Sequence, residues 1–357
     1  MRKILFISII LLVSCREEID LDLFPADQRM VVQGSIEPGF PPYIILTKNQ
    51  GYFDPINSNT YNDLFIKDAE VTVWKRNENG GIDSIKLEPL PPPLDTLPIY
   101  TDINYMIQFL LNQETPIPYP FSQAGNSYNL EIKWNDNIIT GTTTIPNPVP
   151  YDSIWIEETE FEYDEPRKCI IFCTYTDPDT IGNNFVLRSK RIYHGIKDSI
   201  PYLYPQNAIA NDADESLLLV DAGIDILING TTFDFPIYRP SDNGGFANGT
   251  YNSTHYKKYK DTLTNGKDSV LVAADTVLLK FNQVDVTALK FWRGVVRNVT
   301  SGGNPFAEPM NLSSNINGGL GTWTGFGATY YKVPINKDTT IIHNYTVEKG
   351  LNILDIF

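Results

Sequence analysis

The sequence has few of the residues that most often carry chemistry. Its 357 residues include three cysteines and three histidines. His194, His255 and His343 have no second histidine or cysteine at metal-ligand spacing. There is no His-Glu-x-x-His motif and no Gly-x-Ser-x-Gly elbow. The sequence therefore predicts no catalytic residue, no metal site, no cofactor and no enzymatic activity.

Two of the cysteines lie in one predicted strand, residues 169–176. Cys169 and Cys173 would share a face of that strand but stand ~13 Å apart, because each strand residue advances about 3.3 Å. A disulfide needs Cα atoms within about 7 Å. We expect both to be small apolar core residues.

Positive charge is also scarce, with 28 basic against 43 acidic residues. Removal of residues 1–14, which contain Arg2 and Lys3, leaves 26 basic residues and a net charge of −17. Nucleic acid and anionic lipid headgroups both attract positively charged surfaces. The balance argues against either as a partner.

Long apolar runs are missing except at the amino terminus. Residues 4–13 are apolar apart from Ser8, which is too short to cross ~30 Å of hydrocarbon. Residues 1–14 therefore form an export signal. Its end, Leu12-Val13-Ser14-Cys15, resembles the lipobox of bacterial lipoproteins, which implies that Cys15 is acylated and becomes the first mature residue. An ordinary secretory signal with a chance cysteine is the alternative.

A short charged segment follows the cysteine within the predicted tether, residues 15–27. Its acidic members Glu17, Glu18 and Asp20 resemble the export signal of Bacteroidota lipoproteins displayed on the outer leaflet of the outer membrane. A solvated tether without a sorting role is the alternative. The resemblance implies a lipid-anchored protein of the outer membrane that faces the cell exterior.

Short segments rich in Val, Ile, Thr, Tyr and Phe predict an all-β fold with one or two short helices. The first half has candidate strands at 30–36, 43–47, 69–75, 127–134 and 138–145, with a hairpin turn at 135–137. These predict an N-terminal immunoglobulin/transthyretin-like β-sandwich over residues 28–147.

Three prolines within residues 146–150 interrupt strand pairing and mark the predicted domain boundary. Residues 148–357 then predict a larger β-sandwich or partly closed β-barrel. Its candidate strands are 153–163, 169–176, 185–193, 217–220, 269–281 and 339–345.

Two segments have the spacing of helices rather than strands. Residues 103–112 follow a proline-rich loop and are apolar on nearly all sides, so this helix must pack on its own domain or dock a partner. Residues 285–298 repeat apolar side chains at helical spacing, and packing on a sheet explains them.

Other acidic and glycine-rich segments resemble calcium or phosphate sites, but turns and loops explain them better. Residues 177–182 begin like a calcium loop but have Ile181 at the fifth position and Arg188 at the twelfth, so we expect a turn. The acidic segment 211–215 is expected to be a solvated loop. The glycines between 318 and 327 lack a Walker lysine and are typical of bulges and bends.

An Asp-Ser/Thr tripeptide recurs more often than composition explains. It resembles the O-glycosylation acceptor of Bacteroidota, whereas a turn aspartate followed by a strand hydroxyl is the plainer explanation. The candidate acceptors are Ser84, Thr96, Ser153, Ser199, Thr262, Ser269 and Thr276.

Several segments in order along the mature chain resemble the Bacteroidota family known as domain of unknown function 4249 (DUF4249). They include residues 31–36 with 44–47, 69–73, 125–128, 144–154, 177–185 and 303–321. The most specific lies near the carboxyl end and contributes Asn315, Gly318, Gly319, Gly321 and Trp323 as structural residues. Thr322-Trp323 departs from the expected apolar residue and phenylalanine, and residues 89–113 look like an insertion.

Genes of such proteins often lie beside those of TonB-dependent β-barrel transporters of the outer membrane. The resemblance therefore implies a non-enzymatic accessory or ligand-capturing partner of a transporter, and it brings no catalytic residues. A structural or adhesive envelope lipoprotein, and an unrecognised hydrolase with a distant acid–base pair, are the alternatives.

Overall fold

The computed structural model describes residues 28–50, 63–92, 95, 98–111, 118–159, 168–193, 218–223, 228–239, 250–252, 255–258, 269–272, 275–301, 311–335 and 342–343. Within these ranges the chain is mostly strand, with the two helices α3 and α5. The predicted all-β class with one or two short helices is confirmed.

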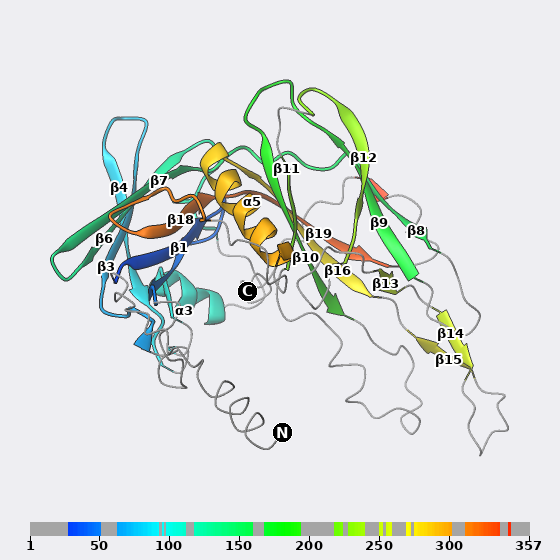
Figure 1. Cartoon of the computed structure of the whole chain (residues 1–357), viewed down its shortest axis with the longest axis horizontal. Coiled ribbons are helices and arrows are strands. Elements are labelled where there is room, and N and C mark those ends of the chain that lie inside the picture. The colour runs from blue at the N-terminus through cyan, green and yellow to red at the C-terminus, as the bar shows by residue number, and fades with distance from the viewer. Residues whose placement is uncertain are drawn as a thin grey trace, which may run out of the picture.

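The amino-terminal half forms a nearly closed, barrel-like sheet of nine strands (Figure 1). Its order is β17-β7-β6-β3-β4-β5-β2-β1-β18. The strands are β1 (Met30–Ile36), β2 (Tyr43–Lys48), β3 (Glu70–Arg76), β4 (Ile82–Pro89), β5 (Ile99–Thr101), β6 (Ser127–Trp134), β7 (Asn137–Thr144), β17 (Ile316–Asn317) and β18 (Leu320–Gly325). The two end strands, β17 and β18, are joined by Gly318 and Gly319 alone, so this turn brings the two edges of the sheet together.

Alternation along the strands decides which side chains enter the barrel. β3 and β6 bury every second residue, as expected for a sheet with one apolar face. The core that results contains Val32, Ile44, Leu46, Val71, Val73, Leu87, Tyr100, Leu130 and Ile132. Asn135 has a φ of 51° in the two-residue turn between β6 and β7, which confirms the predicted hairpin.

One end of the barrel is filled by polar and aromatic side chains. Lys75 follows the inward register of β3, is 8% exposed, and donates to the carbonyl of Phe121 at 2.8 Å. Its ammonium also lies 5.8 Å from the ring centroid of Tyr128. These contacts satisfy the Lys75 charge inside the barrel.

Helix α3 (Ile103–Leu111) confirms the predicted helix at 103–112. It begins after Asp102, whose carboxylate accepts from the backbone N–H of Tyr105 at 3.2 Å, an N-cap contact. The same carboxylate accepts from the Tyr119 hydroxyl at 3.0 Å. Burial raises the pKa of Tyr119, with the nearby Asp102 charge adding to the effect.

The carboxyl-terminal half is a sandwich of two sheets. One has the order β11-β10-β16-β19, and the other β12-β9-β8-β20 with β13 also paired to β9. The strands are β8 (Ser153–Glu158), β9 (Lys168–Thr176), β10 (Asn184–Tyr193), β11 (Leu218–Gly223), β12 (Thr232–Ile237), β13 (Tyr251–Asn252), β16 (Thr276–Val284), β19 (Gly327–Pro334) and β20 (Ile342–His343). An aromatic core that includes Tyr151, Tyr175, Phe281 and Tyr331 fills the space between them.

A nearly continuous strand joins the barrel to the sandwich. β18 ends at Gly325 and β19 begins at Gly327, so only Phe326 separates them. The backbone N–H of Phe326 donates to Ile36 O at 2.9 Å. In Figure 1 this orange to red segment runs from one half of the molecule into the other.

Helix α5 (Val286–Ser301) lies between the two halves in Figure 1 and confirms the predicted helix at 285–298. Asp285 caps it through Oδ1, which accepts from the N–H groups of Thr287 and Ala288 at 2.9 and 2.8 Å. Its apolar face packs Leu289 and Trp292 against Phe326 and the outer face of the β10–β16 pair.

Two features differ from the sequence-based expectation. Residues 28–147, predicted as a β-sandwich, instead contribute seven strands to the barrel-like sheet, which takes β17 and β18 from the later segment. The sandwich of the carboxyl-terminal half is one of the two forms predicted for residues 148–357. The predicted strand 269–281 is two strands, because β15 (Ser269–Val272) pairs with β14 (His255–Lys258) whereas β16 pairs with β10 and β19.

Candidate functional site

The other end of the barrel is open and forms a depression of about 400 Å³, which we call the barrel mouth. Its most prominent side chain is Trp134, the last residue of β6. Tyr128, Leu130 and Ile132 are the buried residues of this strand, and the same period carries Trp134 inward at the end. The indole is half-buried there.

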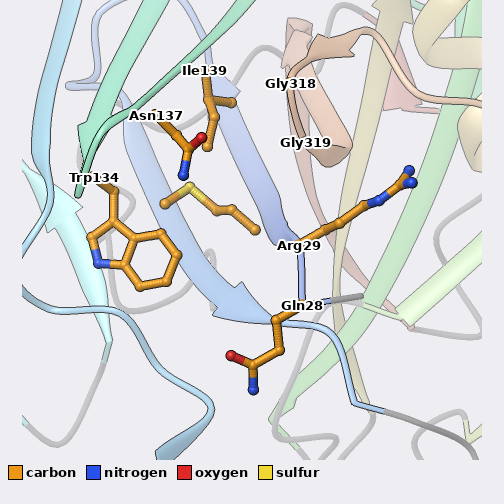
Figure 2. Close-up of a pocket in the computed structure, with 8 residues that line it drawn as sticks. Gln28, Arg29, Trp134, Asn137, Ile139, Gly318 and Gly319 are labelled. Atoms are coloured by element: carbon orange, nitrogen blue, oxygen red, sulfur yellow. The ribbon is translucent and has the colours of Figure 1, made fainter. Parts of the chain in front are cut away.

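The mouth has an apolar floor and a polar rim. Buried Met30 and Ile139 form the floor beside the indole, and exposed Gln28, Arg29 and Asn137 form the rim. Figure 2 shows Trp134 and Asn137 on one side of the depression and Arg29 with the Gly318-Gly319 turn on the other.

The turn that closes the sheet also lines the mouth, and it requires glycine. Gly318 has a φ of +81°, in the left-handed region. A Cβ atom on Gly319 would lie 3.0 Å from the carbonyl oxygen of Met30. The two family-motif glycines therefore let β17 and β18 approach the start of β1.

The Trp134 ring is held in place by charged neighbours. Its Nε1–H donates to Asp68 Oδ1 at 3.1 Å, and the Lys48 ammonium lies 5.6 Å from the ring centroid. Lys48 is the direct cross-strand partner of Met30. The indole thus has its one donor occupied and presents carbon surface to the mouth.

The lining of the mouth offers binding groups. Its eight residues supply an indole, a thioether, an aliphatic side chain, two amides, a guanidinium and two glycines, with no carboxylate, imidazole or thiol among them. The volume falls within the range of about 300–1,000 Å³ that small-ligand sites occupy. Such a lining can hold a ligand by contact and hydrogen bonding, and it contains no pair of groups suited to acid–base catalysis.

The remaining family-motif residues hold the edges of the barrel sheet together and do not line the mouth. Asn315 Nδ2 donates to Trp323 O at 2.7 Å, and Trp323 N donates to Asn315 Oδ1 at 2.8 Å. Trp323 is fully buried and its Nε1 donates to Tyr128 O at 3.2 Å. Gly321 has a φ of +100°, and a Cβ there would lie 2.0 Å from Val32 O. These residues hold β18 in the sheet.

A buried charged cluster joins the barrel to the sandwich. Glu37 follows β1, and its carboxylate lies 2.5 Å from the Lys280 ammonium of β16 and 2.6 Å from the Tyr330 hydroxyl of β19. Burial, followed by the Glu37 charge, raises the pKa of Tyr330 well above its ordinary value. The Arg188 guanidinium lies 4.3 Å from the Trp292 ring centroid, and burial lowers its pKa. The cluster fixes the two halves to each other.

The residues predicted for lipidation and export, Cys15, Glu17, Glu18 and Asp20, lie outside the described residues. So do the acceptor candidates Thr96, Ser199 and Thr262, and the acidic segment 211–215.

Four of the predicted hydroxyl acceptors lie in described strands. Ser84 is exposed on β4, whereas Ser153 is half-buried and its hydroxyl donates to Thr174 Oγ1 at 2.9 Å. Ser269 lies in β15, and half-buried Thr276 begins β16. Ser84 is therefore the most accessible acceptor of those whose side chains are described.

Both strand cysteines are buried and neither forms a disulfide, which confirms their predicted place in the core. Burial raises the pKa of Cys173.

Residues 179–182 form bends and turns, as expected. Across the described part of the chain, no group of three His, Cys, Asp or Glu side chains is placed to hold a metal ion. Neither described helix is long and apolar enough to cross a membrane.

The family model for the domain of unknown function DUF4249 matches residues 16–331. This chain belongs to the DUF4249 family. A comparison with curated proteins gives no match. Among solved structures, the chain is similar to Salmonella alpha-2-macroglobulin reacted with methylamine, with 9% identity over 76% of this chain and 15% of that one, at a TM-score of 0.20. That score is too low to support an argument.

Sequence reasoning missed the mouth of the DUF4249 barrel. It predicted Gly318 and Gly319 as structural residues but did not connect them to Trp134 or Arg29. One signal was present, because Trp134 ends a strictly alternating strand on its buried register just before a tight turn. The other partners come from residues far apart in sequence, which only the closed sheet brings together.

Proposed function

We propose that this DUF4249 chain is a lipid-anchored accessory protein of the outer membrane that captures a ligand for a TonB-dependent transporter and does not transform it. The open barrel mouth carries this proposal. It is concave, accessible and lined by contact and hydrogen-bonding groups.

The position of the mouth along the chain supports a role near a membrane partner. Gln28, on the rim, directly follows the predicted tether of residues 15–27. A tether of this length reaches at most about 45 Å when fully extended. A ligand held at the mouth would therefore stay close to the membrane to which Cys15 is attached.

The buried ionisable groups support binding over catalysis. Glu37, Lys280 and Tyr330 contact one another and are each no more than 4% exposed. Lys75 is likewise satisfied by carbonyl and ring contacts inside the barrel. These groups stabilise the fold, and none of them lines the mouth.

The test is purification of the full-length lipoprotein from native membranes under mild detergent. We expect a β-barrel transporter to co-purify, and we expect metabolic labelling with a fatty acid to mark the wild-type protein. The Cys15→Ala variant should lose the label and appear in the soluble fraction. Recovery of the labelled protein from these membranes without any β-barrel transporter would overturn the proposed partnership.

A further inference from the structure

The barrel mouth combines one fixed aromatic ring with hydrogen-bonding groups that are mostly uncharged. This combination restricts the chemistry of a ligand more than the volume alone does. The ligand class inferred from this combination rests on the proposed capture function.

The ring selects for a ligand with an apolar face. Because Trp134 Nε1–H is already bound to Asp68, the indole offers a ligand its carbon surface rather than a donor. The Lys48 contact at 5.6 Å and the hydrogen bond fix the ring before a ligand arrives. Preorganisation of this kind reduces the entropy that binding costs.

The rim selects for a ligand edge that both donates and accepts hydrogen bonds. Each amide of Gln28 and Asn137 has a carbonyl acceptor and two N–H donors, and Arg29 adds guanidinium donors. Hydroxyl groups match this set because each one donates and accepts. Carboxylates only accept, so they would leave the amide carbonyls unmatched.

The net negative charge of the chain argues against an anionic ligand as well. Arg29 is the single charged residue of the lining, while residues 15–357 carry a net charge of −17. The field of so acidic a chain lowers the local concentration of anions. An uncharged ligand approaches without that penalty.

We propose that the barrel mouth binds a neutral saccharide. The C–H face of a sugar ring packs against Trp134, and its hydroxyls bond with Gln28, Asn137 and Arg29. The ligand that the protein captures is then a neutral glycan or a fragment of one.

The test is calorimetric titration of the detergent-solubilised full chain with defined probes. The neutral probes are the hexasaccharides of the malto-, cello-, xylo-, manno- and chito-oligosaccharide series. The anionic probe is oligogalacturonate. We expect at least one neutral probe to bind and the anionic probe to bind more weakly. Absence of binding by all neutral probes, or tighter binding of oligogalacturonate, overturns the proposal.

Three variants locate the binding. Trp134→Ala should weaken the affinity for the bound probe at least tenfold, whereas Trp134→Phe should keep most of it. Asn137→Ala, at an exposed rim position that does not support the core, should weaken it severalfold even if Trp134→Ala fails to fold. The matched control is Ile138→Ser, because Ile138 is the neighbour of Asn137 on β7 but points away from the barrel and is 63% exposed. Equal affinity in Asn137→Ala and the wild type would place any binding elsewhere.

The outcome separates the ligand class from the proposed function. If a transporter co-purifies but the protein binds no neutral probe, the accessory role is supported and the saccharide proposal is wrong. If a neutral probe binds at the mouth but no transporter co-purifies, the saccharide proposal is supported and the proposed partnership is wrong.

Discussion

The side-chain amide of Asn315 pairs with the backbone of Trp323 through two hydrogen bonds, one donated in each direction, at 2.7 and 2.8 Å. Its Nδ2 also lies 3.4 Å from Thr142 O on β7. One amide therefore occupies the position of a strand between β7 and β18, where β17 is only two residues long. This side chain therefore links β18 to β7 by hydrogen bonds.

Replacement of Asn315 should loosen the junction of β7, β17 and β18, which we call the seam. Asn315→Ala leaves the N–H and C=O of buried Trp323 without their partner, and an unsatisfied buried group costs about 1–3 kcal/mol. Asn315→Asp keeps the acceptor for Trp323 N but loses the donor, so it should destabilise as well. Denaturant unfolding measures both. Asn317→Ala is the control, because Asn317 is exposed on the same hairpin, and an equal loss in that variant would contradict the seam's role.

The glycines of the seam should be among the least replaceable residues. At Gly321 a Cβ would lie 2.0 Å from Val32 O, and the φ of +100° is unfavourable for any side chain. At Gly325 a Cβ would lie 2.3 Å from Thr144 O. Either change to alanine should prevent folding or cost well over the roughly 1–3 kcal/mol of backbone strain alone.

Gly39 provides the comparison for that measurement. Its φ is +79°, yet a Cβ there meets nothing within 4 Å. Gly39→Ala should therefore cost only the strain of the left-handed conformation, about 1 kcal/mol. Similar losses at Gly39 and Gly321 would show that the close approach of β18 to β1 is not what requires glycine.

The sequence predicts strands well where one face is buried and the other exposed. β1 and β6 were predicted with their observed bounds, because β6 alternates along its length and β1 alternates over residues 30–34. β18 was missed because Thr322, Trp323 and Thr324 are all buried, so no alternation exists to detect. The two threonine hydroxyls satisfy each other at 2.9 Å. This contact arises only after the strand is enclosed between the barrel core and the rest of the molecule.

The mouth was not predictable for a related reason. Arg29, Trp134 and Gly319 are separated by more than a hundred residues at each step, and only the return of the chain at β17 and β18 places them together. The parallel pairing of β1 with β18 has no local signal in the sequence. The domain boundary expected at 147–148 also assigned residues near 320 to a separate domain, so they were not expected to contribute strands to the barrel.

Breaking the buried Glu37–Lys280 pair should destabilise the protein strongly. Removal of one partner leaves the other charge buried, which costs about 3–5 kcal/mol. We expect Glu37→Gln and Lys280→Met each to lower the free energy of unfolding by this amount. The double variant Glu37→Leu with Lys280→Met should recover much of the loss, because no uncompensated charge remains.

A surface pair gives the matched control for that cycle. Lys133 and Glu131 lie 3.1 Å apart with side chains 51% and 38% exposed. Lys133→Ala should cost less than about 1 kcal/mol, since exposed ion pairs contribute little. A loss as large as that of Lys280→Met would mean that burial does not set the strength of the Glu37 contact.

Accessibility predicts which acceptor candidate carries a glycan. Ser84 is exposed on β4, whereas the Ser153 hydroxyl is bonded to Thr174 within the sheet. The intact mass of protein from its native host should fall by one glycan in Ser84→Ala and stay unchanged in Ser153→Ala. Equal masses for wild type and Ser84→Ala would contradict modification at this site.

Alkaline pH should unfold the protein through its buried tyrosines. Burial raises the pKa values of Tyr151 and Tyr330 well above the ordinary 10.0, and the Glu37 charge adds to the effect at Tyr330. Because the folded pKa lies above the unfolded one, the stabilisation is complete below pH 10 and is lost as the pH rises beyond it. Each of the two tyrosines should contribute about 1.4 kcal/mol per pH unit to this loss. Tyr330→Phe, although less stable at neutral pH, should show a shallower decline above pH 10 in denaturant unfolding. A slope equal to that of the wild type would show that Tyr330 ionises as readily in the folded protein as in the unfolded chain.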